Sequence, residues 1–433
     1  MLPNTKYSPK HQSVLRIWRR RYSFHLGKLR CKWVMYFCVA FLFLVFLLPN
    51  PFASRYDKLM IRQDIRWEGI SEILEEKEKI LVEDPFSKQV KFRRYGKEEL
   101  SSTRPVLILL YTTIFLSKKY CKLKQVEHIF GETCPSKHRC QWTCDVRKLN
   151  EADAVIFHGY DMQYYPSEMP KRSDTKSDAI WILWSDEPHS MVDYSLFKDY
   201  RFNWTISFKL NSEVSIGSYG LFQKRNVPQL DSEHRLWIER QFRDRSNAAL
   251  WFVSNCEARE RLQYYRDLRR EANVYVEGYG RCVDYYPMHL CAASSQCEID
   301  YMSKFKYYLS FESITCRDYI TEKFFKAFYH GLIPIVYGPE RKDYERFAPA
   351  DSFIHVNDFN KNMNKLANYL LEIHLNLTLF AKYHQWRKTH DVIIDGKALE
   401  RIRMCELCER LTRVRREDVT YYEDINEFYH EKC

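Results

Sequence analysis

Residues 307–338 read YYLSFESITCRDYITEKFFKAFYHGLIPIVYG, and this stretch decides the fold class. The apolar run over 307–311 predicts a buried strand, and the amphipathic pattern over 319–330 predicts a helix. Gly331 stands where the first residue beyond a helix C-terminus is expected, and a second apolar run follows over 332–337. A strand, a helix and a strand in this order predict a βαβ unit with parallel strands.

Short apolar runs of the same kind recur in the preceding sequence. They are bounded by polar loops, which is typical of strands buried inside a parallel sheet. We expect strands at 106–111, 154–157, 179–184, 249–253 and 274–276, and a further helix at 259–271. The alternation predicts an α/β protein of two halves, at 101–245 and 246–390, with a cysteine-containing tail at 391–433.

The segment between the strand and the helix of the βαβ unit carries most of the chemically active side chains. Open α/β sheets bind ligands beyond the carboxyl ends of their strands, and a helix N-terminus favours an anion. With Asp318 as the expected N-cap, Lys323 lies one turn into the helix, on the same face as Tyr319. Glu322 can accept hydrogen bonds from sugar hydroxyls. The pattern fits a diphosphate site, and a capped, solvated helix start is the alternative.

The N-terminal part has its own charge and hydropathy pattern. Residues 1–32 hold nine Lys or Arg and no acidic residue, which leaves 59 basic and 57 acidic residues in the remainder. The net charge of +11 is therefore local, and no nucleic-acid partner is expected. The apolar, uncharged residues 33–52 predict a transmembrane signal anchor with the basic tail in the cytosol, and a cleaved signal peptide is the alternative. Residues 53–100 are expected to form a stem between the anchor and a lumenal globular part.

Twelve of the fourteen cysteines lie in the predicted lumenal part, where an even number indicates disulfides. Zinc is the alternative for the C-x-x-C pair near the C-terminus and for the earlier cysteines beside His138, but a zinc site needs four ligands. Two sequons permit N-glycosylation, at Asn203 and Asn376. The disulfide candidates are Cys134, Cys140, Cys144, Cys316, Cys405 and Cys408.

Several motifs of the second half resemble the donor-site sequences of the Golgi α1,3-fucosyltransferases. The main ones are Tyr308–Glu312, Asp318–Phe325 and Gly331–Gly338, followed by Ser352–Ile354 and Asp358–Phe359. Residues 251–256, with Arg259, Arg261 and Leu262, resemble the other donor-site block of that family. The resemblance covers roughly residues 100–360 and is dense from 249 onward.

The resemblance implies a GT-B fold, in which two Rossmann-like domains face a cleft. It also implies an inverting transfer of L-fucose from GDP-β-L-fucose to position 3 of a GlcNAc-containing glycan on glycoproteins or glycolipids. By motif position, Arg261 and Lys323 are expected to contact the diphosphate. The full donor-binding set implied by the resemblance is Arg261, Glu312, Ser313, Tyr319, Glu322 and Lys323.

The chain departs from the family at one donor-site position. The family usually has Phe-Glu-Asn-Ser, whereas residues 311–314 read Phe-Glu-Ser-Ile. Ser313 therefore supplies a shorter hydroxyl in place of an amide. This leaves open a GT-B transferase that uses a different GDP-sugar. A catalytically silent Golgi relative that binds glycans is the other alternative.

An inverting transfer needs a general base that removes a proton from the acceptor hydroxyl. Similar enzymes carry a Glu shortly before a Pro, after an aromatic-rich strand, and residues 181–190 are the matching place here. Glu187 is the expected base because its side chain reaches further than that of the alternate, Asp186. His189 is a third candidate.

No cofactor is expected to be required, since Arg261, Lys323 and the helix dipole can stabilise the leaving phosphate. The chain contains no Asp-x-Asp motif, and manganese is expected at most to stimulate the reaction. The resemblance and the anchor together predict a single-pass type II protein of the Golgi membrane with a lumenal catalytic part. Whether it forms a homodimer, and which glycan it accepts, stay open.

Overall fold

A computed structural model of the chain describes residues 104–122, 128–283, 291, 295–414, 421–431 and 433, together with Ile70 and Ile73. The predicted cytosolic tail, the predicted anchor and nearly all of the predicted stem lie outside these residues. Within the described ranges, no helix combines the length and the apolar character that a membrane span requires.

The first half contains a five-stranded sheet in which all strands are parallel, as predicted. The central strands consist of β-branched, aromatic and other apolar residues and are buried from end to end. The predicted strands are confirmed, whereas the two edge strands were missed because they have only four and three residues. In spatial order the strands are β2 (Cys140–Thr143), β1 (Val106–Leu110), β3 (Ala154–His158), β4 (Ile180–Trp184) and β5 (Trp204–Ile206).

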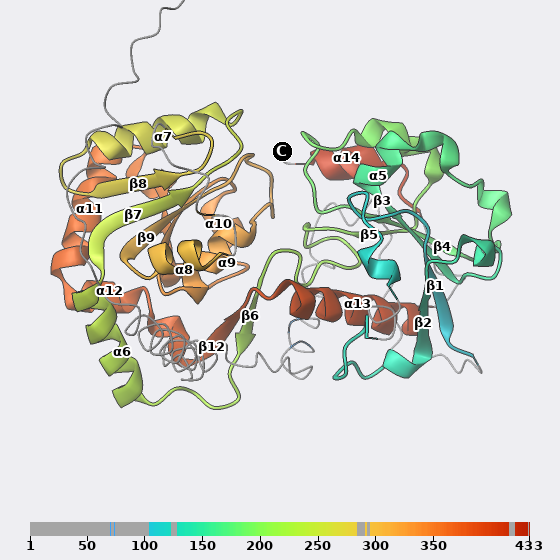
Figure 1. Cartoon of the computed structure of the whole chain (residues 1–433), viewed down its shortest axis with the longest axis horizontal. Helices are drawn as coiled ribbons and strands as arrows, with labels where there is room; N and C mark the ends of the chain where they lie inside the picture. The colour runs from blue at the N-terminus through green and yellow to red at the C-terminus, as the bar shows by residue number, and fades with distance from the viewer. Residues whose placement is uncertain are drawn as a thin grey trace, which may run out of the picture. The chain divides into compact units, whose positions relative to one another are not determined.

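The second half contains another five-stranded parallel sheet. Its βαβ unit is the one predicted from residues 307–338, and Gly331 has the left-handed φ of +80° that the chain needs beyond the helix. Helices α7 (Arg259–Arg270) and α11 (Met363–Leu375) pack on one face, and α9 (Glu322–Tyr329) packs on the other (Figure 1). The strand order is β11 (Ile354–His355), β10 (Ile333–Tyr337), β9 (Phe305–Phe311), β7 (Ser246–Phe252) and β8 (Tyr275–Tyr279).

The start of α9 differs from the prediction. The helix begins at Glu322 with Thr321 as its N-cap, so Asp318 is not the cap. Asp318 instead has a left-handed φ of +66°, and its carboxylate accepts a hydrogen bond from the backbone N–H of Leu210 at 3.1 Å. It also forms an ion pair with Arg346. These partners lie far away in sequence, which is why the local pattern misplaced the cap.

The remaining elements connect the two sheets and cover them. β6 (Leu221–Lys224) and β12 (His390–Ile393) form an antiparallel pair, from which α13 (Gly396–Arg413) leads back to the first sheet (Figure 1). The apolar residues of α13 pack on one face of that sheet. The other described helices are α5 (Gly159–Tyr164), α6 (Asp231–Asp244), α8 (Gln296–Met302), α10 (Arg341–Tyr344), α12 (Leu377–Lys382) and α14 (Ile425–His430).

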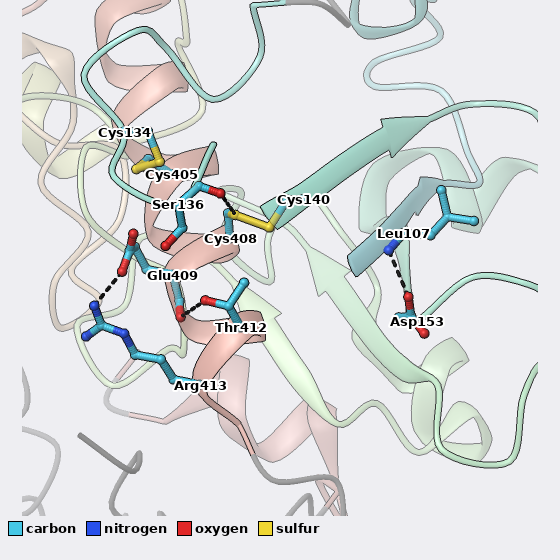
Figure 2. Close-up of a disulfide and its surroundings, with 10 residues drawn as sticks. All are labelled: Leu107, Cys134, Ser136, Cys140, Asp153, Cys405, Cys408, Glu409, Thr412 and Arg413. Carbon is cyan, nitrogen blue, oxygen red and sulfur yellow. Dashed lines mark hydrogen bonds and ion pairs between the residues drawn. A yellow bond between two sulfur atoms is a disulfide. The ribbon is translucent and has the colours of Figure 1, made fainter. Parts of the chain in front are cut away.

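Disulfides fasten α13 to the first sheet (Figure 2). Cys405 pairs with Cys134 and Cys408 pairs with Cys140, across sequence separations of 271 and 268 residues. Such long-range links restrict the unfolded chain strongly. Each sulfur of this C-x-x-C pair is thus bonded to a cysteine of the first half and is not a thiolate ligand for zinc. The other four disulfides are Cys121–Cys144, Cys256–Cys282, Cys291–Cys297 and Cys316–Cys433.

Part of the predicted stem contacts the globular part. Ile70 is fully buried in an apolar cluster that contains Leu221 of β6, Ile393 of β12 and Leu399 of α13. Ile73, one helical turn later, packs against the same cluster. The stem was expected to hold the globular part away from the membrane, but this portion of it packs onto the connection between the two sheets.

The two sequons have opposite environments. Asn203 is 8% exposed, and its Oδ1 accepts hydrogen bonds from the backbone N–H of Trp181 at 2.9 Å and from Arg172 at 2.5 Å. Glycosylation at Asn203 stays a prediction, which the burial of its side chain disfavours. Asn376 is exposed and caps α12 by accepting the N–H of Leu379.

We therefore expect one N-glycan, at Asn376, when the full chain is expressed in eukaryotic cells. Thr378→Ala removes the sequon but leaves the capping Asn376 in place, and it is expected to abolish the mobility shift that N-glycosidase treatment produces. Thr378→Ser keeps the sequon and serves as the matched control. A shift that persists in Thr378→Ala would show that Asn203 carries a glycan.

Candidate active site

Glu187 lies just beyond the carboxyl end of β4, in the first half of the chain. Burial raises the pKa of its carboxyl to about 7, and the negative charges of Asp186 and Glu322 add to this rise. The positive charge of Lys323 opposes it. Because Glu322 and Lys323 belong to α9, these charges show that both halves contribute to the electrostatic environment of Glu187.

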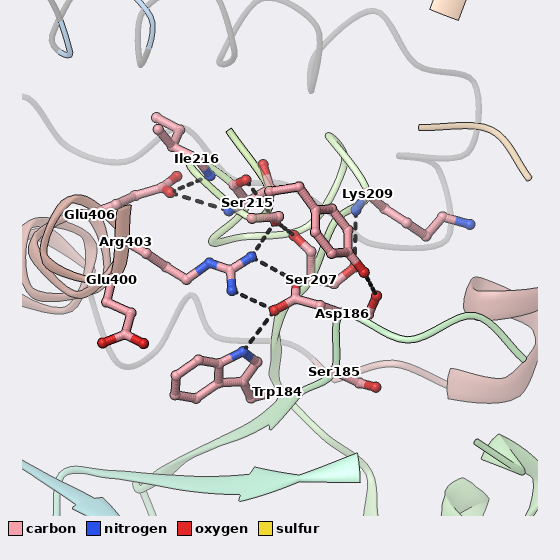
Figure 3. A network of polar contacts seen from close by, with 12 residues as sticks. Trp184, Ser185, Asp186, Ser207, Lys209, Ser215, Ile216, Glu400, Arg403 and Glu406 are labelled. Carbon is pink, nitrogen blue, oxygen red and sulfur yellow. Dashed lines mark hydrogen bonds and ion pairs between the residues drawn. The ribbon is translucent and has the colours of Figure 1, made fainter. Parts of the chain in front are cut away.

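The carboxylate of Asp186 forms an ion pair that the sequence did not reveal (Figure 3). Its two carboxylate oxygens accept hydrogen bonds from the guanidinium of Arg403 at 2.5 and 2.7 Å. The indole N–H of Trp184 donates to the same carboxylate at 3.1 Å. Arg403 is buried and belongs to α13, 217 residues further along the chain. Asp186 is therefore ion-paired and held in place.

The contrast between the two carboxylates favours Glu187 as the base. Within the described ranges, no residue donates a hydrogen bond to the carboxylate of Glu187, and its raised pKa suits proton transfer near neutral pH. Asp186 instead has the role of a structural anchor. The third candidate, His189, packs its ring against that of His430, with 4.4 Å between the ring centroids.

Tyrosine hydroxyls hold the backbone of the segment that carries Glu187. The hydroxyl of Tyr194 donates to the carbonyl oxygen of Glu187 at 2.6 Å and shares a 2.7 Å hydrogen bond with the Ser185 hydroxyl. The hydroxyl of Tyr219 donates to the carbonyl oxygen of Asp186 at 2.5 Å. These contacts position the backbone while leaving the carboxylate of Glu187 available.

In the second half, a lysine and two carboxylates meet beyond the carboxyl end of β9. Lys323 Nζ lies 3.3 Å from Glu312 Oε2 and 3.5 Å from Glu322 Oε1, and it donates to Thr321 Oγ1 at 2.6 Å. Burial acts to lower the pKa of Lys323, but the two carboxylates raise it above its ordinary value. Lys323 therefore keeps its positive charge in a partly buried place, as a residue that binds a diphosphate must.

Glu312 has a structural role in this cluster. Its side chain is buried and accepts hydrogen bonds from the backbone N–H of Thr321 at 2.8 Å and from the Thr321 hydroxyl at 3.0 Å. These contacts tie the end of β9 to the start of α9. Glu322 is half-exposed, so it is the carboxylate of the pair that a ligand can reach.

Tyr319 and Ser313 lie between the two groups of charges. The ring of Tyr319 packs against Phe208 and Tyr219 of the first half, with centroid distances of 5.2 and 6.0 Å. Burial raises the pKa of the Tyr319 hydroxyl, and the charges of Glu312 and Glu187 raise it further. The nearby Ser313 hydroxyl acts in the opposite direction and lowers this pKa, which places Ser313 close to Tyr319.

Arg261 lies deeper than the resemblance implies. Its guanidinium donates to the carbonyl oxygen of Phe311 at 2.9 Å and to that of Asn255 at 2.8 Å, which fixes the loops that follow β9 and β7. The side chain is buried, and its Nε has no hydrogen-bond partner within the described part of the chain. The expected contact with a diphosphate stays a prediction.

Three comparisons place the chain among known proteins. A family model described as "Fucosyltransferase, N-terminal" matches residues 103–220, and one described as "Glycosyltransferase family 10 (fucosyltransferase) C-term" matches residues 242–428. The 4-galactosyl-N-acetylglucosaminide 3-alpha-L-fucosyltransferase 9 of Rattus norvegicus is 30% identical over 281 residues, which are 63% of this chain and 70% of that protein. The alpha-(1,3)-fucosyltransferase 7 of Bos taurus is 31% identical over 325 residues, 73% and 86% of the two chains.

A solved structure is similar as well. The crystal structure of an alpha1,3-fucosyltransferase with GDP-fucose superposes with a TM-score of 0.42 at 16% sequence identity. The superposition covers 79% of this chain and 99% of the other.

The ion pair of Asp186 leads to a prediction about stability. Arg403→Met removes the cation and leaves a largely buried carboxylate without compensation, so we expect the free energy of unfolding to fall by about 3 kcal/mol. Urea denaturation followed by tryptophan fluorescence measures this change. The double variant Asp186→Asn/Arg403→Met is expected to recover part of the loss, because it removes both charges. Equal stability of Arg403→Met and the wild type would contradict the assigned role of the pair.

Proposed function

The chain belongs to glycosyltransferase family 10, the fucosyltransferases, and on this basis we propose that it transfers L-fucose from GDP-β-L-fucose to a glycan. We propose α1,3 linkage to a GlcNAc unit, with inversion at the anomeric carbon. The two parallel sheets correspond in this proposal to the two Rossmann-like domains of a GT-B enzyme. The family and the named activity of its relatives support the reaction, and the arrangement of charges supports the roles of individual residues.

One observation carries the proposal furthest. The carboxyl group of Glu187, in the first half, has a pKa of about 7. The charges of Glu322 and Lys323, in the second half, contribute to this pKa. An inverting transfer to a hydroxyl requires a base whose pKa is near neutrality. It also requires a positive charge, here that of Lys323, to stabilise the leaving group. A silent, glycan-binding relative would need neither group in these protonation states.

In the proposed reaction, Glu187 removes the proton of the acceptor hydroxyl while its oxygen attacks C1 of fucose. The bond from C1 to the β-phosphate oxygen breaks on the opposite face, so the configuration inverts. Negative charge then grows on GDP, where Lys323 and the positive N-terminal end of the α9 dipole are available to stabilise it. We expect manganese at most to stimulate this step.

Glu322 and Tyr319 are proposed to contact the nucleotide and fucose. Glu322 is half-exposed at the first position of α9, and Tyr319 lies within electrostatic range of both Glu187 and Glu322. The Ser313 hydroxyl, close to Tyr319, replaces the amide usual in the family at this place. This substitution is the reason to test other GDP-sugars beside GDP-fucose.

The cellular setting is proposed from the sequence. The basic tail and the apolar segment 33–52 support a type II anchor in the Golgi membrane, with the catalytic part in the lumen. The twelve paired cysteines after residue 100 are consistent with an oxidising compartment. The acceptor would then be a glycan on a glycoprotein or glycolipid.

Glu187→Gln is expected to lower kcat by about 10²–10⁴-fold, because it removes the base and keeps the size of the side chain. The assay uses the full-length protein, GDP-fucose beside other GDP-sugars, and a panel of GlcNAc-containing glycans, with linkage determined by specific fucosidases. Glu187→Asp is the control, and it should keep part of the activity. Full transfer by Glu187→Gln would assign the base to another residue.

The pKa of Glu187 also predicts a pH dependence. The base is active only when deprotonated, so kcat should rise with pH through about 7 and then level off. Stability should change in the opposite sense, because the folded protein holds this proton up to about pH 7 while the unfolded chain releases it near the ordinary value of 4.5. Above pH 7, Glu187→Gln should therefore melt at a higher temperature than the wild type, and a lower melting temperature would count against the raised pKa.

A further inference from the structure

The last residues of the chain form a segment that contacts both halves, and we call residues 421–431 with Cys433 the C-terminal strap. Its helix α14 places Phe428 and Tyr429 in the apolar cluster on the face of the first sheet opposite to α13. At the start of the strap, the backbone N–H of Tyr422 donates to Phe202 at 2.8 Å. The strap is therefore a packed part of the first half.

Within this cluster, the strap reaches the backbone of the base. The ring of Tyr429 stacks on that of Tyr194, with 3.7 Å between centroids and planes only 3° apart. Tyr194 is the residue whose hydroxyl donates to the carbonyl oxygen of Glu187. The hydroxyl of Tyr429 itself donates to the carbonyl oxygen of Ser185 at 3.3 Å. Two tyrosines in contact thus hold both sides of the backbone that presents Glu187.

The other end of the strap is bonded to the loop that carries the donor-site residues. Cys433 forms a disulfide with Cys316, three residues before Tyr319. Both Cys316 and Tyr319 are buried in the same apolar cluster as Phe428 and Tyr429. The loop between β9 and α9 therefore packs on the first half through the strap.

Charged groups add to this connection. Glu431 is buried, and its carboxylate lies 3.7 Å from Arg317 of the second half and 4.0 Å from Lys209 of the first half. Lys209 is buried too, and its Nζ donates to the carbonyl oxygen of Phe428 at 2.5 Å, near the C-terminal end of α14. A cation at this end of a helix is favourable.

We propose that the C-terminal strap sets the position of Glu187 relative to the donor-binding loop, with Tyr429 as a positioning residue that acts through Tyr194. The proposal rests on the proposed function, because it assigns the strap a role in fucose transfer. The family model matches residues only as far as 428, so it includes neither Tyr429 nor Cys433. The proposed positioning role is therefore argued from the contacts that these residues make in this chain. Small displacements of a base reduce the rate of transfer without weakening the binding of the donor.

The test uses the full-length protein in detergent and four variants. Tyr429→Ala removes the stacked ring, and Tyr429→Phe keeps it. Cys316→Ser/Cys433→Ser opens the disulfide without leaving a free thiol. Cys121→Ser/Cys144→Ser removes a disulfide whose two ends both belong to the first half, and it is the matched control.

Two readouts are taken. For Tyr429→Ala and for the open Cys316–Cys433 variant, kcat should fall at least about tenfold while KM for GDP-fucose stays within about twofold. Hydrogen exchange should accelerate in residues 185–192 and 313–321 and stay unchanged in the strands of both sheets. The control should behave as the wild type does in both readouts. Tyr429→Phe, which keeps the stacked ring and loses only the hydroxyl bond to Ser185, should lie between Tyr429→Ala and the wild type.

Each result has a defined meaning. Unchanged kcat and unchanged exchange in the two loops would overturn the proposal, and so would accelerated exchange across the whole chain, which indicates a general loss of stability. Hydrogen exchange does not depend on turnover. If the wild type transfers no fucose but the two loops still loosen together, the proposed function fails while the positioning by the strap holds.

Discussion

The ion pair between Arg403 and Asp186 is the interaction on which the arrangement of the site depends. It joins a buried guanidinium of α13 to the residue directly before Glu187. Two disulfides hold α13 on the first sheet, so the position of Arg403 is fixed by covalent bonds. Since Arg403 engages the carboxylate of Asp186, the neighbouring Glu187 is the carboxylate that stays available. Its burial and the charges of Asp186 and Glu322 raise its pKa to a value suited to a base.

Much of the fold could be predicted from sequence because it depends on local patterns. The apolar runs marked the central strands, and residues 307–338 gave the βαβ unit with its left-handed Gly331. The edge strands β2 and β5 were too short to leave a pattern. The cap of α9 was misplaced because Asp318 bonds to Leu210 and Arg346, and contacts between distant residues do not appear in a local pattern.

In the candidate site, too, local patterns point to some residues, while others are placed only by contacts between distant parts of the chain. Glu187, Tyr319, Glu322 and Lys323 were proposed from motifs, because their spacing around a strand end and a helix start is local. Arg403, Tyr194 and Tyr429 were missed, since they act through contacts made only when the chain is folded. The buried side chain of Asn203 shows that a motif does not report the accessibility of its residues. Local motifs thus suggest residues that could bind or react, whereas the contacts that hold those residues in place appear only in the fold.

The proposed reaction depends on Glu187 being a base whose pKa is held near 7 by its surroundings. Its titration can be measured directly as the infrared difference between the wild type and Glu187→Gln, which isolates the carboxyl band of this one residue from pH 4 to pH 9. We expect a carboxyl band that is lost with a midpoint near pH 7. A midpoint near the ordinary value of 4.5 would contradict it, because Glu187 would then be a solvated carboxylate with no special environment.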